Sequence, residues 1–246
     1  MDTVLFLAFA IAYAALLVWG ARSAARRGLW SPASLPLLVL AGLVYDNLLI
    51  GTGRWIGEGD TLETLNLLRF WIHVLVTPVL VAWALHALRR AGFGWAQATW
   101  FQVFAILSSL ALTVVEYLTE LRGLRIVPER VYGVLSYTSA APSDGPPVMV
   151  LVVALVLLLV GALLWRRKGW PWLFAGALVM TIGSAVQLPV PSGAVTNAFE
   201  LLLLASLTAT MVPAGPGRGA VTQPDGAGRA RGLSGEDRAR GNRVDA

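Results

Sequence analysis

Long apolar runs constrain this chain most, because each has the length that crosses a lipid bilayer as a helix. Seven such segments are predicted, at residues 3–19, 35–52, 67–88, 97–118, 147–165, 170–188 and 195–213. A helix of about 20 apolar residues spans the hydrocarbon core, and backbone groups in lipid must be hydrogen-bonded within their own segment. We therefore expect an all-α, polytopic protein with seven transmembrane helices, located in the cell membrane.

The composition agrees with this class and separates the chain into two parts. Hydrophobic residues make up 57% of the sequence and charged residues 13%, whereas soluble domains carry about 25% charged residues. Residues 1–213 are expected to form one membrane domain. Residues 214–246 are rich in Gly, Arg, Ala and Asp, so they have too little apolar surface to fold. We expect a disordered cytoplasmic tail there.

The basic residues predict the orientation of the domain. Fourteen of the nineteen lie in the tail and in the loops after the first, third and fifth spans. Basic loops stay in the cytoplasm, so the N-terminus is expected outside and the C-terminus in the cytoplasm. The net charge of +5 then indicates contact with anionic lipid rather than with nucleic acid.

Three carboxylates interrupt the apolar segments. Asp46, Glu116 and Glu200 lie in the second, fourth and seventh spans, and counting from the loops places all three at the same depth near the outer face. An ionisable group in hydrocarbon is costly unless it is paired or faces a cavity, which makes it a candidate functional group. Arg69 and His73 in the third span fall at the same level, so we predict one polar chamber.

Helical spacing adds further residues to this chamber. Asn66, Arg69 and His73 are spaced to share one face of the third span, and the first and fifth spans carry no polar group there and are expected to serve as walls. The catalytic candidates are Asp46, Glu116 and Glu200. The substrate-binding candidates are Tyr45, Asn47, Arg54, Trp55, Arg69, Trp71, His73, Tyr117, Gln187 and Asn197.

Two loops on the predicted outer side are long enough to serve as lids or binding elements. They cover residues 53–66 and 119–146, and loops of more than about 12–15 residues often have such roles. The loops on the other side are short and basic, as connectors are.

Each carboxylate also has a purely structural interpretation. Asp46 can pair with Arg54 or Arg69 and lock two helices together. Glu116 can lie at the level of the lipid headgroups. Glu200, with Asn197, can cap the last helix, where the helix dipole favours negative charge.

The chemistry that fits such a chamber is proton transfer to an apolar substrate. A carboxylic acid among apolar groups retains its proton more readily than in water and can deliver it to a substrate. Aromatic rings stabilise developing cations through their faces, and several are expected at this level: Tyr45, Trp55, Phe70, Trp71, Tyr117 and Phe199. Together these groups suit protonation of an isoprenoid alkene or epoxide.

Motifs for several other chemistries are missing from the sequence. It has no Asp-Asp-x-x-Asp run for magnesium and diphosphate, and no Gly-x-Ser-x-Gly elbow for a serine hydrolase. Two histidines and no cysteine cannot build a His-Glu-x-x-His zinc site or a His-box di-iron site. We therefore expect neither a metal nor another cofactor.

The seven-span architecture, with an acid late in the second span and another in the seventh, resembles the small heptahelical integral-membrane terpene cyclases. These occur in fungal meroterpenoid and bacterial indole-sesquiterpenoid pathways. The resemblance covers residues 3–213 as architecture and implies acid-initiated, metal-independent cyclisation of a prenyl chain. By this analogy Asp46 and Glu200, or Glu116, would be the proton donor and its partner. A lipophilic isoprenoid substrate and an upstream prenyltransferase or epoxidase are also implied.

Two other functions remain open from the sequence. The same acid can serve a lipid isomerase or hydrolase. Alternatively, Asp46 and Glu116 can be the coupling or ligand-binding groups of a proton-coupled transporter or a heptahelical sensor. Against transport, the sequence shows no inverted repeat, and the inner halves of the spans carry no matching polar path.

Overall fold

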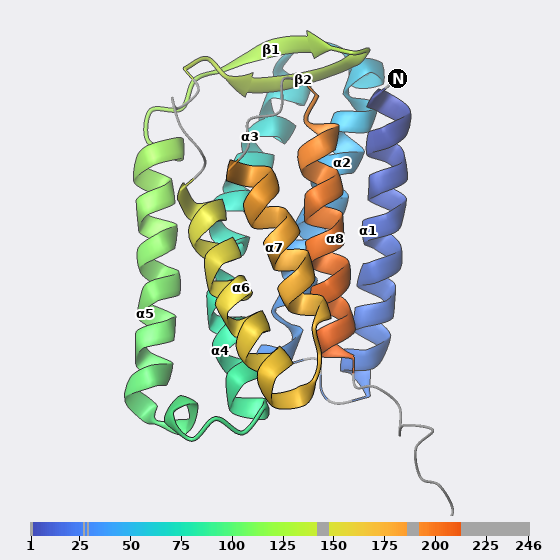
Figure 1. Ribbon diagram of the computed structural model, residues 1–246. Helices are drawn as coiled ribbons and strands as arrows, with labels where there is room; N and C mark the ends of the chain where they lie inside the picture. Colours follow the sequence, from blue (N-terminus) through green and yellow to red (C-terminus); the bar gives the residue numbers. More distant parts are fainter. Residues whose placement is uncertain (1, 27, 29, 142–147, 186–191, 213–246) are drawn as a thin grey trace, which may run out of the picture. The chain divides into compact units, whose positions relative to one another are not determined.

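The structure is a computed structural model, and it describes residues 2–26, 28, 30–141, 148–185 and 192–212. These residues are mostly helical and form one compact unit (Figure 1). The α-helices of this part are α1 (Asp2–Ala25), α2 (Pro36–Ile56), α3 (Asp60–Val76), α4 (Val79–Arg90), α5 (Thr99–Glu116), α6 (Val148–Lys168), α7 (Trp172–Ala185) and α8 (Ala194–Met211). The predicted tail at 214–246 lies outside the described residues, and its disorder stays a prediction.

The described helices are compatible with a membrane protein. Six stretches are long and apolar enough to cross a bilayer, counting α3 and α4 as one. The apolar helix α7 has 14 residues, about 21 Å of helix, so it is shorter than the roughly 30 Å of a hydrocarbon core. Seven spans and their orientation therefore stay predictions.

The predicted loop at 53–66 is largely helical. Helix α2 continues to Ile56, and α3 begins at Asp60. The two glycines of the connection have positive φ angles, 87° at Gly57 and 149° at Gly59, which residues with a side chain rarely adopt. This connection is therefore a tight turn rather than a lid.

A proline divides the third predicted span into two helices. Pro78 has no backbone N–H and cannot continue the hydrogen-bond ladder of α3, so α3 ends at Val76 and α4 begins at Val79. After the break α4 packs against α6, whereas α3 packs against α2. The two halves of one apolar run thus belong to different walls of the bundle.

The predicted loop at 119–146 contains a β-hairpin, so the all-α expectation was incomplete. Strands β1 (Ile126–Val131) and β2 (Val134–Ser139) pair antiparallel, with Val131 opposite Val134. The two turn residues, Tyr132 and Gly133, both have positive φ, as two-residue hairpin turns of type I′ require. The hairpin lies across one end of the bundle, here called the hairpin end (Figure 1).

The main core lies between α1, α2, α4, α6, α7 and α8. Glycines allow the last three helices to approach closely: a side chain at Gly161 of α6 would meet the backbone nitrogen of Phe174 in α7 at 2.6 Å, and one at Gly176 of α7 would overlap Ser206 of α8. Helix α5 is peripheral, because only Ala105 and Glu116 of its residues are buried. The core therefore leaves α5 at the edge.

Candidate functional site

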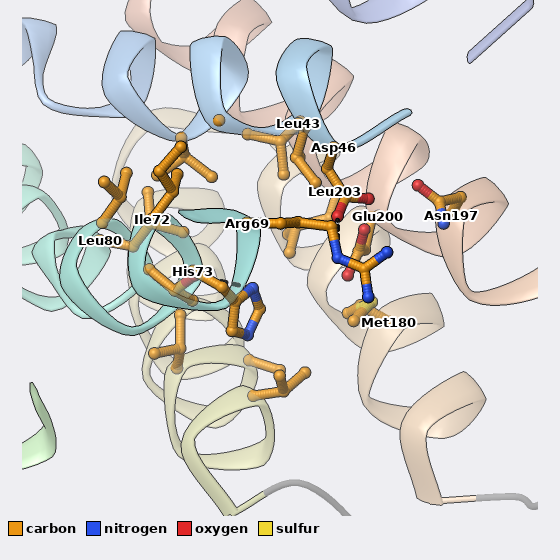
Figure 2. Close-up of a pocket in the computed structure, with 18 of the residues that line it drawn as sticks. Leu43, Asp46, Arg69, Ile72, His73, Leu80, Met180, Asn197, Glu200 and Leu203 are labelled. Atoms are coloured by element: carbon orange, nitrogen blue, oxygen red, sulfur yellow. Dashed lines mark hydrogen bonds and ion pairs between the residues drawn. The ribbon is translucent and has the colours of Figure 1, made fainter. Parts of the chain in front are cut away.

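A pocket of about 310 Å³ lies between α2, α3, α4, α6, α7 and α8 (Figure 2). Such a volume is at the lower end of the range for small-molecule pockets, about 300–1,000 Å³. Most of its lining is aliphatic, with valines, leucines or isoleucines from α2, α3, α4, α6 and α8. The polar side chains in the lining are Asp46, Arg69, His73, Thr77, Asn197 and Glu200.

An ion pair joins α2 to α3 at the wall of this pocket. Arg69 Nε lies 3.2 Å from Asp46 Oδ1, so of the two partners expected for Asp46 the structure has Arg69. The same guanidinium donates from Nη2 to the Tyr137 carbonyl at 3.4 Å and lies 5.0 Å from the centre of the Phe70 ring. Arg69 thus links α2, α3 and strand β2.

Glu200 faces this pair from α8. Figure 2 shows its carboxyl group close to Asp46 and to the arginine side chain. Within the described residues Glu200 forms no ion pair and no hydrogen bond, since the only cation at the pocket wall, Arg69, pairs with Asp46. Two carboxyl groups therefore share the field of one guanidinium.

Helix α1 supports the same region of α8. The Tyr13 hydroxyl, fully buried, donates to the Asn197 carbonyl at 2.9 Å. The first span was expected to be a wall of the chamber, but α1 contributes no lining residue, and of the two predicted walls only the fifth span, α6, lines the pocket. A lone tyrosine in an apolar run has no spacing signal that separates it from ordinary core packing.

Five of the predicted site residues line the pocket: Asp46, Arg69, His73, Asn197 and Glu200. The prediction from helical periodicity that residues of α2, α3 and α8 lie together is confirmed for these five. The predicted residues that are not part of the lining are Tyr45, Asn47, Arg54, Trp55, Trp71, Glu116 and Tyr117. Gln187 lies outside the described residues.

Glu116 does not join Asp46 and Glu200, and the prediction of one chamber with three carboxylates was wrong in this respect. It is the last residue of α5 and only 5% exposed. Its neighbour Tyr117 contacts Trp71 of α3, with ring centres 5.9 Å apart, and both rings are exposed. Trp71 is not a lining residue, so Glu116 belongs to the peripheral contact of α5 with α3.

The other predicted binding residues have structural contacts instead. The Tyr45 hydroxyl donates to the Leu65 carbonyl at 2.9 Å and joins α2 to α3. The fully buried Asn47 donates to the Leu43 carbonyl within its own helix. Arg54 and Trp55 are exposed, and the Arg54 guanidinium carbon lies 5.5 Å from the centre of the Trp55 ring.

The expected aromatic walls are also mostly absent from this pocket. Of the six rings predicted at this level, only Phe70 is a lining residue. The described residues contain no group of three or more His, Cys, Asp or Glu side chains placed to hold a metal ion. The arrangement therefore offers an acid, an ion pair and an imidazole in an aliphatic cavity.

The hairpin docks where it can orient Arg69. A side chain at Gly53 of α2 would overlap the Leu135 carbonyl, so only glycine allows β2 to lie this close. Leu135 and Tyr137 pack with Leu49 and Leu62, and the Tyr137 hydroxyl accepts from the Gly59 amide at 3.1 Å. The Tyr137 carbonyl is thereby held beside Arg69.

We expect Gly53→Ala to destabilise the protein by about 1–3 kcal/mol, the usual cost of overpacking a close contact. The added methyl group displaces the backbone of β2 and with it the acceptor of Arg69. The measurement is thermal unfolding in detergent micelles. Gly51→Ala is the control, since its methyl group would meet the Leu7 side chain at 3.0 Å and the Leu7 backbone nitrogen at an ordinary contact distance of 3.4 Å. Equal melting temperatures for the two variants would contradict this docking.

No protein family, no curated protein sequence and no solved structure matches the chain. The resemblance to small membrane terpene cyclases therefore rests on the number of spans and the position of the acids. The function has to be argued from the pocket itself.

Proposed function

We propose that this protein is a membrane-embedded acid catalyst that acts on an isoprenoid chain. Most concretely, it is a metal-independent terpene cyclase that protonates a terminal epoxide or alkene. Glu200 is the proton donor, and the Asp46–Arg69 pair is its charged partner. The carrying observation is that Glu200 faces a largely aliphatic cavity and that no cation among the described residues pairs with it.

Charge balance selects Glu200 over Asp46 as the donor. A carboxylate in a low-dielectric interior needs a cation or several hydrogen bonds to stay ionised. Arg69 supplies one positive charge, and Asp46 already uses it at 3.2 Å. Glu200 then holds its proton, and the adjacent ion pair stabilises the carboxylate that forms when the proton leaves.

The shape of the pocket supports an apolar substrate with one reactive end. The acid, the ion pair and Asn197 lie toward the hairpin end of their helices, while Val39, Leu80 and Leu204 line the opposite part. A prenyl chain can place its epoxide or terminal alkene at Glu200 and its hydrocarbon among the aliphatic side chains. With Phe70 as the one predicted ring in the lining, the ion pair provides most of the charge stabilisation in this scheme.

The experiment uses the full chain in proteoliposomes with a farnesol derivative that carries a terminal epoxide. We expect conversion to cyclic isomers of the same mass, detected by gas chromatography and mass spectrometry. Val150 lines the pocket, so the larger side chain of Val150→Trp should occupy the cavity and abolish conversion. Leu155→Trp, on an exposed face of the same helix, should retain it.

The proposal would be overturned if the wild-type protein and Leu155→Trp both failed to convert this epoxide and also failed to convert the corresponding alkene. A pH-dependent flux across the same proteoliposomes would then favour transport. A product altered only in a headgroup would favour a lipid hydrolase.

A further inference from the structure

His73 is a core-facing residue of α3 whose side chain lines the pocket. Leu62, Asn66, Arg69 and His73 follow each other on one face of the helix, and the first two are fully buried. The exposed residues Thr64, Leu68, Trp71 and Leu75 mark a different face. His73 is nevertheless exposed and lines the pocket, so its accessible surface faces the cavity, as Figure 2 shows for its ring.

The position of His73 along the cavity differs from that of the acid. It follows Arg69 by one helical turn, about 6 Å farther from the hairpin end. At that level the lining changes from the charged groups to aliphatic residues such as Val76 and Leu80. An imidazole thus lies beside the middle of any chain whose reactive end is at Glu200.

One ring nitrogen of His73 is free to act as a base. Nδ1 lies 3.5 Å from the Thr77 hydroxyl, one turn along the same helix. In the tautomer that donates from Nδ1 to this hydroxyl, Nε2 keeps its lone pair. The other polar lining groups are weaker candidates, because Asp46 is engaged by Arg69 and the Asn197 amide and Thr77 hydroxyl are not basic.

We propose that His73 is the base that ends the reaction started by Glu200. This inference rests on the proposed function and deepens it by assigning the residue that determines the product. Protonation by Glu200 opens the epoxide or converts the terminal alkene into a carbocation. Ring closure then moves the cationic centre along the chain, away from the acid. His73 Nε2 then removes a proton from the carbon next to the cation, the C–H electron pair becomes the new double bond, and imidazolium forms. Return of that proton to Glu200 completes an isomerisation with no net gain or loss of atoms.

The test compares product distributions rather than rates alone. Full-length wild type, His73→Phe, His73→Gln and the control His86→Phe are each given the terminal epoxide of farnesol in proteoliposomes. His86 lies near the other end of the bundle and does not line the pocket. We expect the His73 variants to form less of the wild-type alkene, by about 100-fold or more, the usual contribution of a positioned general base. Other alkene isomers and alcohols from water capture should replace it.

The outcomes separate this inference from the proposed function. If the wild-type protein converts the substrate and both His73 variants give its product in unchanged proportion, His73 is not the terminating base. Loss of all conversion in both variants, with folding shown intact by thermal unfolding, would also contradict the assignment. Absence of conversion by the wild-type protein and by His86→Phe would overturn the proposed function itself.

Discussion

Glu200→Gln should lower the turnover of a prenyl epoxide by a factor of about 100 to 10,000, the usual contribution of a positioned general acid. Glutamine has the same shape as glutamic acid and retains the packing of α8, but it has no acidic proton to transfer. Because Glu200 forms no hydrogen bond or ion pair within the described residues, the substitution breaks no described polar contact. The protein should therefore keep its melting temperature while losing activity, measured as product formed per enzyme in proteoliposomes.

Glu116→Gln is the matched control for this experiment. It removes another carboxyl group from a helix of the bundle, one that is only 5% exposed and does not line the pocket. We expect close to wild-type turnover from this variant. Full turnover by Glu200→Gln, or equal losses in both variants, would show that the donor has been wrongly assigned.

Arg69→Leu should destabilise the protein by roughly 1–4 kcal/mol, because the pair is partly buried, with side chains 14% and 25% exposed, and lies between an exposed pair, worth up to about 1 kcal/mol, and a fully buried one, which costs about 3–5 kcal/mol to break. Its partner Asp46, whose side chain is only a quarter exposed, would lose the guanidinium that now lies 3.2 Å from its Oδ1. The loss of the bond to the Tyr137 carbonyl adds to the effect. Thermal or denaturant unfolding in micelles measures this change.

The double variant Asp46→Leu/Arg69→Leu distinguishes a lost ion pair from lost packing. Replacing both members of a buried pair with apolar groups is often neutral or even stabilising. We therefore expect the double variant to recover most of the stability that Arg69→Leu loses, while remaining inactive because the charged partner of Glu200 is gone. A double variant at least as unstable as Arg69→Leu would mean that Arg69 acts mainly through its aliphatic stem and its contact with β2.

The sequence predicted part of the pocket because helical periodicity fixes which residues share a face. Arg69 and His73 are four residues apart, and Asn197 and Glu200 are three apart, so each pair projects from one side of its helix. The depth of each residue and the helix face on which it lies were together sufficient to predict that residues of α2, α3 and α8 line the same pocket.

Glu116 shows what depth alone cannot predict. Counting from the loops gives the level of a residue in the membrane, but not the position of its helix around the bundle. Helix α5 packs at the edge, against α4 and the outer side of α3. A residue at the right level can therefore lie on the wrong side of a neighbouring helix.

The hairpin was missed for a different reason. The segment Ile126–Ser139 contains β-branched residues around Tyr132-Gly133, a pattern that favours strands joined by a two-residue turn. Because it lies between two long apolar spans, its position and length alone predict a loop. Its bond to Arg69 depends on a backbone carbonyl, which no side-chain pattern reveals.

The break at Pro78 has a mechanical consequence for the bundle. Because α4 packs on α6 while α3 packs on α2, the pocket lies between helices that belong to differently packed groups. A molecule bound in the pocket would make dispersion contacts with lining side chains that otherwise have no partner atoms on that side. A ligand that binds there only in the folded state is therefore expected to raise the melting temperature of the protein.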